Sequence, residues 1–282
     1  MLQGERVFVL LVLVLVVAQS VFAGSQGRIE SVSYRVTYDN KRYEKTAYVY
    51  VPASYDGEKV MPVLYLLHGS SGSAMQLAEA MAPLLDDWTA RGEIASSLVV
   101  FPTYYPDRSF VTRDYRQDYP LNRFFAQEEI EVLIKVVEGT YHTFARGTDA
   151  GALMTSRLHR AFGGYSMGGV TTWEVLAAKP EYFAYFLPMA GDCWRQGDVA
   201  NLLAEGLRNK GLGADDFRVI AMVGEKDGTK YQMKRQVTAL WEQQGDLFTK
   251  DNLLYWENED GGHDQISLEV ETRHAMPSLW SL

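Results

Sequence analysis

The chain has 282 residues, of which 47% are hydrophobic and 22% are charged, an ordinary balance for a globular protein with a sizeable core. The formal net charge is −9 and the isoelectric point is about 5.1, so nothing in the charge balance indicates a nucleic-acid partner. Cys193 is the only cysteine, which excludes an internal disulfide. The five histidines show no metal-binding spacing, so neither a metal nor another cofactor is expected.

The N-terminal segment contains an unbroken apolar run, VFVLLVLVLVVA, at residues 7–18, preceded by Arg6. The run is shorter than the about 20 residues that a membrane-spanning helix needs. Small residues up to Ala23 suit a signal peptidase, so residues 1–23 are predicted to be a secretory signal peptide and residues 24–282 the mature domain. The alternative is an uncleaved membrane anchor. Cleavage would leave a secreted chain, extracellular or periplasmic, without stable membrane association.

Seven segments have the patterns of β-strands, besides the short strand before Ser166 described below. Residues 32–38 and 45–51 alternate apolar and polar side chains around a DNKR turn, which predicts an antiparallel hairpin at one edge of a sheet. Continuous apolar runs, typical of strands buried on both faces of a parallel sheet, follow at residues 63–67, 97–102, 186–190, 219–223 and 252–256.

Helical patterns lie between these runs, at residues 74–91, 127–137, 170–178 and 231–244. Strand and helix therefore alternate from residue 63 to the end, which predicts an α/β fold with a mostly parallel central sheet and helices on both faces. No internal repeat or Pro/Ser-rich linker divides the chain, so a single domain is expected.

Ser166 lies between two pairs of glycines in the stretch GGYSMGG, after a predicted short strand at residues 159–163 and before a helix. In this context the G-x-S-x-G pattern predicts a sharp strand-to-helix turn that exposes the hydroxyl above the edge of the sheet. Side chains at the flanking positions would collide with neighbouring backbone, which explains the glycines. Ser166 is therefore the predicted nucleophile.

A serine hydroxyl needs a base to accept its proton at neutral pH. In this fold the partners follow the serine in the order acid, then histidine, and only His263 and His274 come after Ser166. His263 lies in a glycine-containing loop directly after the apolar run NLLYW, at the edge of the sheet where sites collect. His263 is therefore the predicted base, and His274 is interpreted as a surface residue.

The acid that orients the base should lie at the end of the preceding strand, where VIAMVGEKDG offers Glu225 and Asp227. Asp227 is preferred because it precedes a glycine in a turn-like position. Asp260 and Asp264 are too close in sequence to His263 to reach its far nitrogen comfortably, and are interpreted as solvent-exposed loop residues.

Acyl transfer also needs N–H donors directed at the oxyanion that develops on the carbonyl oxygen. The backbone N–H of Met167, which follows the nucleophile, is one candidate. The loop LLHGSSGS supplies the second from Ser70, with Ser71 as the alternative, and His68 is interpreted as a structural residue of that loop.

A long irregular stretch at residues 103–123 carries four tyrosines, and connections of this length are uncommon unless they bind something. Tyr104 and Tyr105 directly follow a predicted strand, so they are expected to line a cleft beside the site.

Six segments carry a resemblance to a known family: LLHGSSG, FPTYYPD, GGYSMGGVTTW, FAYFLPMAGDCW, VGEKD and GGHD. With them the chain resembles the esterase D-like α/β-hydrolases, and among these the feruloyl and acetyl-xylan esterases of carbohydrate esterase family one. The resemblance covers residues 45 to about 265. It implies an α/β-hydrolase fold and a Ser166, Asp227, His263 triad. It further implies that Cys193 and Trp194 face the site, the alternative being a buried thiol and a core tryptophan.

The resulting expectation is a secreted serine esterase that hydrolyses feruloyl or other hydroxycinnamoyl esters on xylan. Its partner would be an ester-substituted plant cell-wall saccharide or a small aromatic ester. An acetyl-xylan or general short-acyl esterase is the nearest alternative. A formylglutathione hydrolase suits an exported chain less well, and an acyltransferase would need a site that excludes water. A non-catalytic binding protein on a hydrolase scaffold is the alternative of another class.

Overall fold

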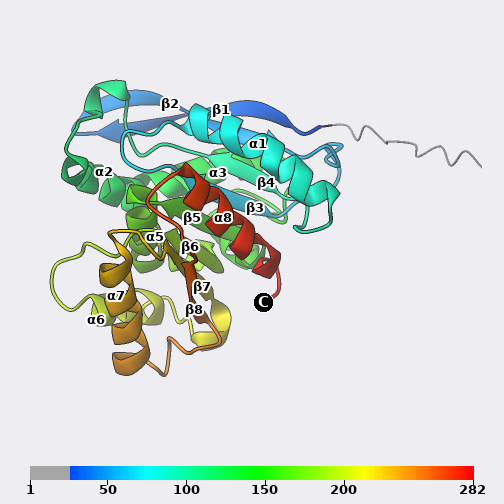
Figure 1. Ribbon diagram of the computed structural model, residues 1–282. Coiled ribbons are helices and arrows are strands. Elements are labelled where there is room, and N and C mark those ends of the chain that lie inside the picture. The colour runs from blue at the N-terminus through cyan, green and yellow to red at the C-terminus, as the bar shows by residue number, and fades with distance from the viewer. Residues whose placement is uncertain (1–25) are drawn as a thin grey trace, which may run out of the picture.

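The computed structural model describes residues 26–282, so the predicted signal peptide lies outside the described residues. Its centre is an eight-stranded sheet in the order β1-β2-β4-β3-β5-β6-β7-β8 (Figure 1). β1 pairs with β2 and β2 with β4 in antiparallel fashion, and all other neighbours are parallel. The strands are β1 (Arg28–Tyr38), β2 (Lys41–Val51), β3 (Val63–Leu67), β4 (Leu98–Phe101), β5 (Arg160–Tyr165), β6 (Tyr185–Met189), β7 (Arg218–Gly224) and β8 (Leu253–Asn258). The predicted hairpin and mostly parallel sheet are confirmed.

Helices cover both faces of the sheet, in agreement with the predicted α/β fold (Figure 1). The cores show that α1 and α8 pack on one face, and α3, α5, α6 and α7 on the other. The helices are α1 (Ala74–Ala90), α2 (Tyr119–Phe124), α3 (Ile130–Thr140), α4 (Ala150–Thr155), α5 (Met167–Ala178), α6 (Val199–Arg208), α7 (Lys230–Gln243) and α8 (Gln265–Ala275). Among residues 26–282, no helix is both long and apolar enough to cross a bilayer.

The continuous apolar runs of the sequence are explained by the helices that cover both faces of the sheet, as β3 illustrates. Val63, Tyr65 and Leu67 belong to the core shared with α3, α5, α6 and α7. Leu64 and Leu66 belong to the core shared with α1 and α8. Because successive side chains of a strand point to opposite faces, a strand buried on both faces needs an apolar residue at every position.

The carboxyl ends of the parallel strands lie along one edge of the sheet. Ser166 follows β5, while Asp227 follows β7 and His263 follows β8. The loop after β3, which runs beside β5, reaches the same edge. Residues nearly 100 positions apart in sequence therefore lie close together at this edge, where α/β sheets form their binding and catalytic sites.

Candidate active site

Ser166 occupies a strained turn between β5 and α5. Its φ is +58° and its ψ is −118°, a conformation that non-glycine residues rarely adopt. The turn needs glycine nearby: a Cβ on Gly164 would lie 2.6 Å from the carbonyl of Gly168, and a Cβ on Gly168 would lie 2.5 Å from the carbonyl oxygen of Leu67. The turn therefore holds the Ser166 hydroxyl above the edge of the sheet, in a strained backbone conformation.

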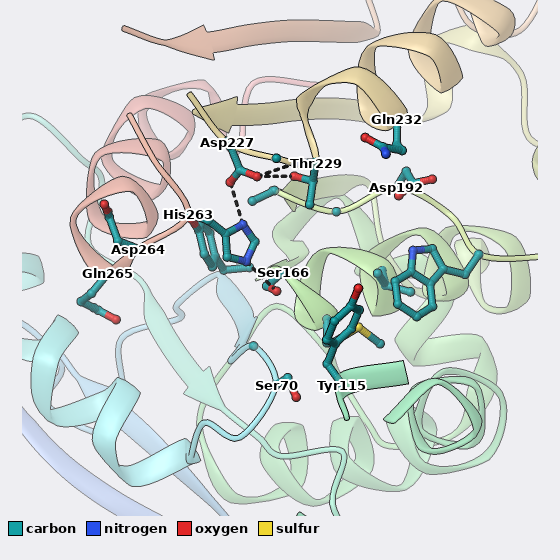
Figure 2. Close-up of a pocket in the computed structure, with 18 residues that line it drawn as sticks. Ser70, Tyr115, Ser166, Asp192, Asp227, Thr229, Gln232, His263, Asp264 and Gln265 are labelled. Atoms are coloured by element: carbon teal, nitrogen blue, oxygen red, sulfur yellow. Dashed lines mark hydrogen bonds and ion pairs between the residues drawn. The ribbon is translucent and has the colours of Figure 1, made fainter. Parts of the chain in front are cut away.

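His263 links Ser166 to Asp227 by hydrogen bonds (Figure 2). Its Nε2 lies 2.9 Å from Ser166 Oγ, and its Nδ1 lies 2.7 Å from Asp227 Oδ2. Asp227 Oδ1 accepts two further bonds, each 2.8 Å, from the N–H and the hydroxyl of Thr229. Because an ionised carboxylate only accepts, Nδ1 carries the ring proton, and Nε2 is free to accept a proton from the serine.

Asp227 is almost completely buried, with 4% of its surface exposed. Burial alone would raise the pKa of its carboxyl, but the hydrogen bonds from His263 and Thr229 outweigh that effect and hold the pKa below its usual value. The carboxylate is thus ionised at neutral pH, as a residue that stabilises an imidazolium must be.

The other acids considered from the sequence make different contacts. Glu225 Oε2 accepts a 3.3 Å bond from the N–H of Asp260, whose own carboxylate forms an exposed ion pair with Lys226 at 2.5 Å. Asp264 Oδ1 caps α8 through a 2.8 Å bond from the N–H of Ser267. Of these acids, Asp227 is the one that bonds to the imidazole.

Two other histidines have structural surroundings. His274 stacks on Trp256 with ring centroids 3.8 Å apart. His68 is buried, with Nδ1 2.7 Å from Gly69 O and Nε2 2.8 Å from Thr103 Oγ1. Burial lowers the pKa of His68 to about 4, so its ring is neutral and bridges the loop after β3 to the loop after β4.

The backbone N–H groups of Met167 and Ser70, both beside Ser166, have no acceptor among residues 26–282. The N–H of Ser71 is already used, because it donates to Tyr105 Oη at 2.9 Å. The loop passes directly over the nucleophile, since a Cβ on Gly69 would lie 3.1 Å from Ser166 Cβ. Ser70 is thereby favoured over Ser71 as the second donor to an oxyanion.

A pocket of about 830 Å³ opens at Ser166 (Figure 2). One wall is aromatic: the rings of Tyr115 and Trp194 have centroids 5.9 Å apart, beside Met167 and Val170. The full lining comprises Gly69, Ser70, Tyr115, Tyr165, Ser166, Met167, Val170, Ala190, Gly191, Asp192, Trp194, Asp227, Gly228, Thr229, Gln232, His263, Asp264 and Gln265. This volume falls in the range of small-molecule sites.

A model of the family described as "Putative esterase" matches residues 42–272. The chain belongs to this esterase family. It is therefore a carboxylic ester hydrolase, as the sequence motifs predicted.

Individual relatives agree with this assignment. Endo-1,4-beta-xylanase Y of Acetivibrio thermocellus is 31% identical over 210 residues, which cover 72% of this chain but only 18% of that protein. A feruloyl esterase module of Clostridium thermocellum, solved with sinapinate, has a TM-score of 0.77 at 29% identity, with 91% of this chain and 89% of the module covered. A ferulic acid esterase of Anaeromyces mucronatus shares the fold, with a TM-score of 0.71 at 17% identity and 92% of each chain covered.

Tyr104 and Tyr105 do not line the pocket of this esterase, contrary to expectation. Both side chains are buried, and both hydroxyls donate to Asp118 Oδ2, at 3.0 and 2.8 Å. The two tyrosines directly follow β4, and their rings lie beneath the irregular stretch at residues 103–123 rather than at its surface. Tyr115, from the same irregular stretch, lines the pocket instead, and nothing in the sequence distinguished it from the other tyrosines.

The neighbours Cys193 and Trp194 have different surroundings in the esterase. Trp194 lines the pocket beside Ser166, as the resemblance implied. Cys193 is 5% exposed and lines an adjoining hollow instead. Burial raises the pKa of its thiol to about 12, which keeps the sulfur protonated and unreactive.

Glu271 on α8 was not identified from the sequence. It is completely buried, and neither carboxylate oxygen has a hydrogen-bond partner among residues 26–282. Burial, together with the negative charges of Asp227 and Asp264, raises its pKa to about 8. Glu271 is therefore an uncharged acid at neutral pH.

Glu271→Gln is expected to reduce the loss of stability that the esterase undergoes as pH rises. Between pH 4.5, where the unfolded side chain ionises, and about pH 8, the folded state binds one proton more than the unfolded state. The free energy of unfolding therefore falls with pH, by up to about 1.4 kcal/mol per unit from this group. Urea unfolding at several pH values across this window measures the slope, with Glu269→Gln on the same helix as the control. Parallel slopes for wild type and Glu271→Gln would contradict the prediction.

Proposed function

We propose that this esterase hydrolyses feruloyl or other hydroxycinnamoyl esters carried by xylan, with Ser166 as nucleophile, His263 as base and Asp227 as the orienting acid. The observation that carries the proposal is the hydrogen-bonded series from Asp227 through His263 to Ser166, beside an aromatic-walled pocket. Nucleophile, base and orienting group each lie within hydrogen-bond reach, as this chemistry requires.

In the first half of the reaction, Ser166 Oγ forms a bond to the ester carbonyl carbon while its proton passes to His263 Nε2. The N–H groups of Met167 and Ser70 bind the resulting oxyanion. Collapse of the intermediate breaks the bond to the alcohol oxygen, which takes the proton from the imidazolium and leaves. Water, deprotonated by His263, then attacks the acyl-enzyme and releases the carboxylic acid, restoring Ser166.

The pocket favours an aromatic acyl group over acetyl. Trp194 and Tyr115 offer ring faces on which a cinnamoyl ring can pack. Asp192 and Gln232, labelled in Figure 2, supply polar groups suited to a phenol. Two relatives point the same way: one module was solved with sinapinate, and one homologue is a xylanase. Xylan is an extracellular polymer, so the proposal includes secretion, in agreement with the signal peptide predicted for residues 1–23.

The proposal is tested by comparing kcat/KM for methyl ferulate, acetylated xylan and formylglutathione on one preparation. The highest value is expected for methyl ferulate. A higher kcat/KM for acetylated xylan would mean that the preferred acyl group is acetyl rather than feruloyl. Absence of turnover, together with absence of fluorophosphonate labelling at Ser166, would indicate a non-catalytic binding protein.

Trp194→Ala is expected to raise KM for methyl ferulate by roughly 10-fold, because loss of an aromatic contact of about 1.4 kcal/mol corresponds to that factor. The rate with p-nitrophenyl acetate at saturation should change little, because acetyl has no ring to pack on the aromatic wall. Tyr231→Ala serves as the control, since Tyr231 is an exposed aromatic residue outside the pocket lining. Equal losses on both substrates would count against Trp194 as an acyl contact.

A further inference from the structure

Apart from the hollow at Cys193, a smaller hollow of about 240 Å³ adjoins the reaction pocket. It lies between the N-terminal ends of α1 and α8, and it shares part of its lining with the pocket at Ser166. The shared residues are Gly69, Ser70, Tyr165, Asp264 and Gln265. The hollow is thus adjacent to the pocket, within reach of a substrate whose carbonyl lies at Ser166.

The geometry of the reaction determines which part of the ester faces this hollow. His263 Nε2, 2.9 Å from Ser166 Oγ, must deliver a proton to the leaving alcohol, so the alcohol lies on the histidine side of the nucleophile. The aromatic wall that suits the acyl group lies on the other side. Figure 2 places Tyr115 to one side of Ser166, and Asp264 and Gln265 to the opposite side, beyond His263. The alcohol therefore departs toward the smaller hollow.

The lining of the hollow suits a neutral polyhydroxylated ligand. Leu77 and Leu268, both buried, contribute apolar surface, and no lysine or arginine from the described part of the chain lines it. Ser73 and the amides of Gln76 and Gln265 supply hydrogen-bonding groups. An amide both donates and accepts, as a sugar hydroxyl does. The side chain of Gln76 is exposed and has no partner among residues 26–282, so it is free to bind.

We propose that this hollow, the α1/α8 groove, binds the sugar residue that carries the ester. The inference rests on the proposed function, because it assigns the alcohol half of the same substrate. The volume is below the range of about 300 to 1,000 Å³ typical of sites for drug-sized ligands, which indicates one sugar ring rather than a length of polymer. The remaining polysaccharide then runs into solvent.

The test compares a feruloyl arabinoside with methyl ferulate, which has the same acyl group but no sugar. Gln76→Trp is designed to fill the groove, and Gln76→Ala removes only the amide. Gln76→Trp should lower kcat/KM for the arabinoside by about 10-fold or more, and Gln76→Ala by about 2- to 10-fold, as expected for one lost hydrogen bond. Both variants should leave methyl ferulate within about 2-fold of wild type. Glu79→Trp, exposed on the same helix but outside both hollows, is the matched control.

The possible outcomes separate the two proposals. Failure of wild type to hydrolyse methyl ferulate overturns the proposed function. Hydrolysis of both esters with an unchanged ratio of their kcat/KM values in Gln76→Trp and Gln76→Ala overturns the groove assignment alone. If Gln76→Trp loses activity on both esters, the ratio in Gln76→Ala decides. A selective loss on the arabinoside in that variant supports the groove, and its absence rejects it.

Discussion

Ser166→Ala is expected to lower kcat for methyl ferulate and p-nitrophenyl acetate by roughly 10³-fold or more. Without the hydroxyl no covalent bond to the acyl group forms, and His263 has no nucleophile to deprotonate. The N–H groups of Met167 and Ser70 remain, so a small residual rate above that in water should persist. Steady-state kinetics on freshly purified protein, with labelling by a fluorophosphonate, measures the loss.

The fold should survive Ser166→Ala, because alanine keeps the Cβ and because, among residues 26–282, the hydroxyl bonds to His263 alone. Ser71→Ala is a suitable control: Ser71 also has a positive φ, +61°, but its hydroxyl lies outside the pocket. Thermal unfolding of both variants checks that the fold is intact. Retention of more than about a tenth of wild-type activity by Ser166→Ala would reject this serine as the nucleophile.

Asp227→Asn is expected to lower kcat by roughly 10²- to 10⁴-fold, through the tautomer of His263. Thr229 directs an N–H and a hydroxyl at Asp227 Oδ1, each at 2.8 Å, so the oxygen of the new amide must occupy that position. The amide NH₂ then faces His263 Nδ1 and forces it to accept. The ring proton moves to Nε2, which can no longer take the proton of Ser166.

Asp264→Asn is the matched comparison, because Asp264 lies beside His263 in sequence and in the pocket but bonds to the N–H of Ser267 rather than to the imidazole. Asparagine also caps helices well, so α8 should remain intact. Its loss of kcat should be far smaller than that of Asp227→Asn, and His263→Ala should lose the most. Equal losses for the two aspartates would require a different acid.

The fold and the principal residues of the site were predictable because both depend on local pattern and on chain order. Continuous apolar runs indicate strands buried on both faces, and the glycines around Ser166 indicate a turn in which a Cβ at Gly164 or Gly168 would clash. Parallel strands then bring the ends of β5, β7 and β8 to one edge, so Asp227 and His263 could be selected by position alone.

What the sequence by itself determined is therefore the architecture, the family and the choice of Ser166, His263 and Asp227 as the proposed triad. Tertiary structure alone decided which tyrosine lines the pocket and that the N–H of Ser71 donates to Tyr105. It also decided that Glu271 is buried near Asp227 and Asp264, with no hydrogen-bond partner among residues 26–282. It also placed Gln76 and Gln265, from helices almost 200 residues apart, on one groove. The physical reason is that strands and turns depend mainly on residues that are neighbours in the sequence. The direction and burial of a loop side chain depend instead on distant segments that pack against it.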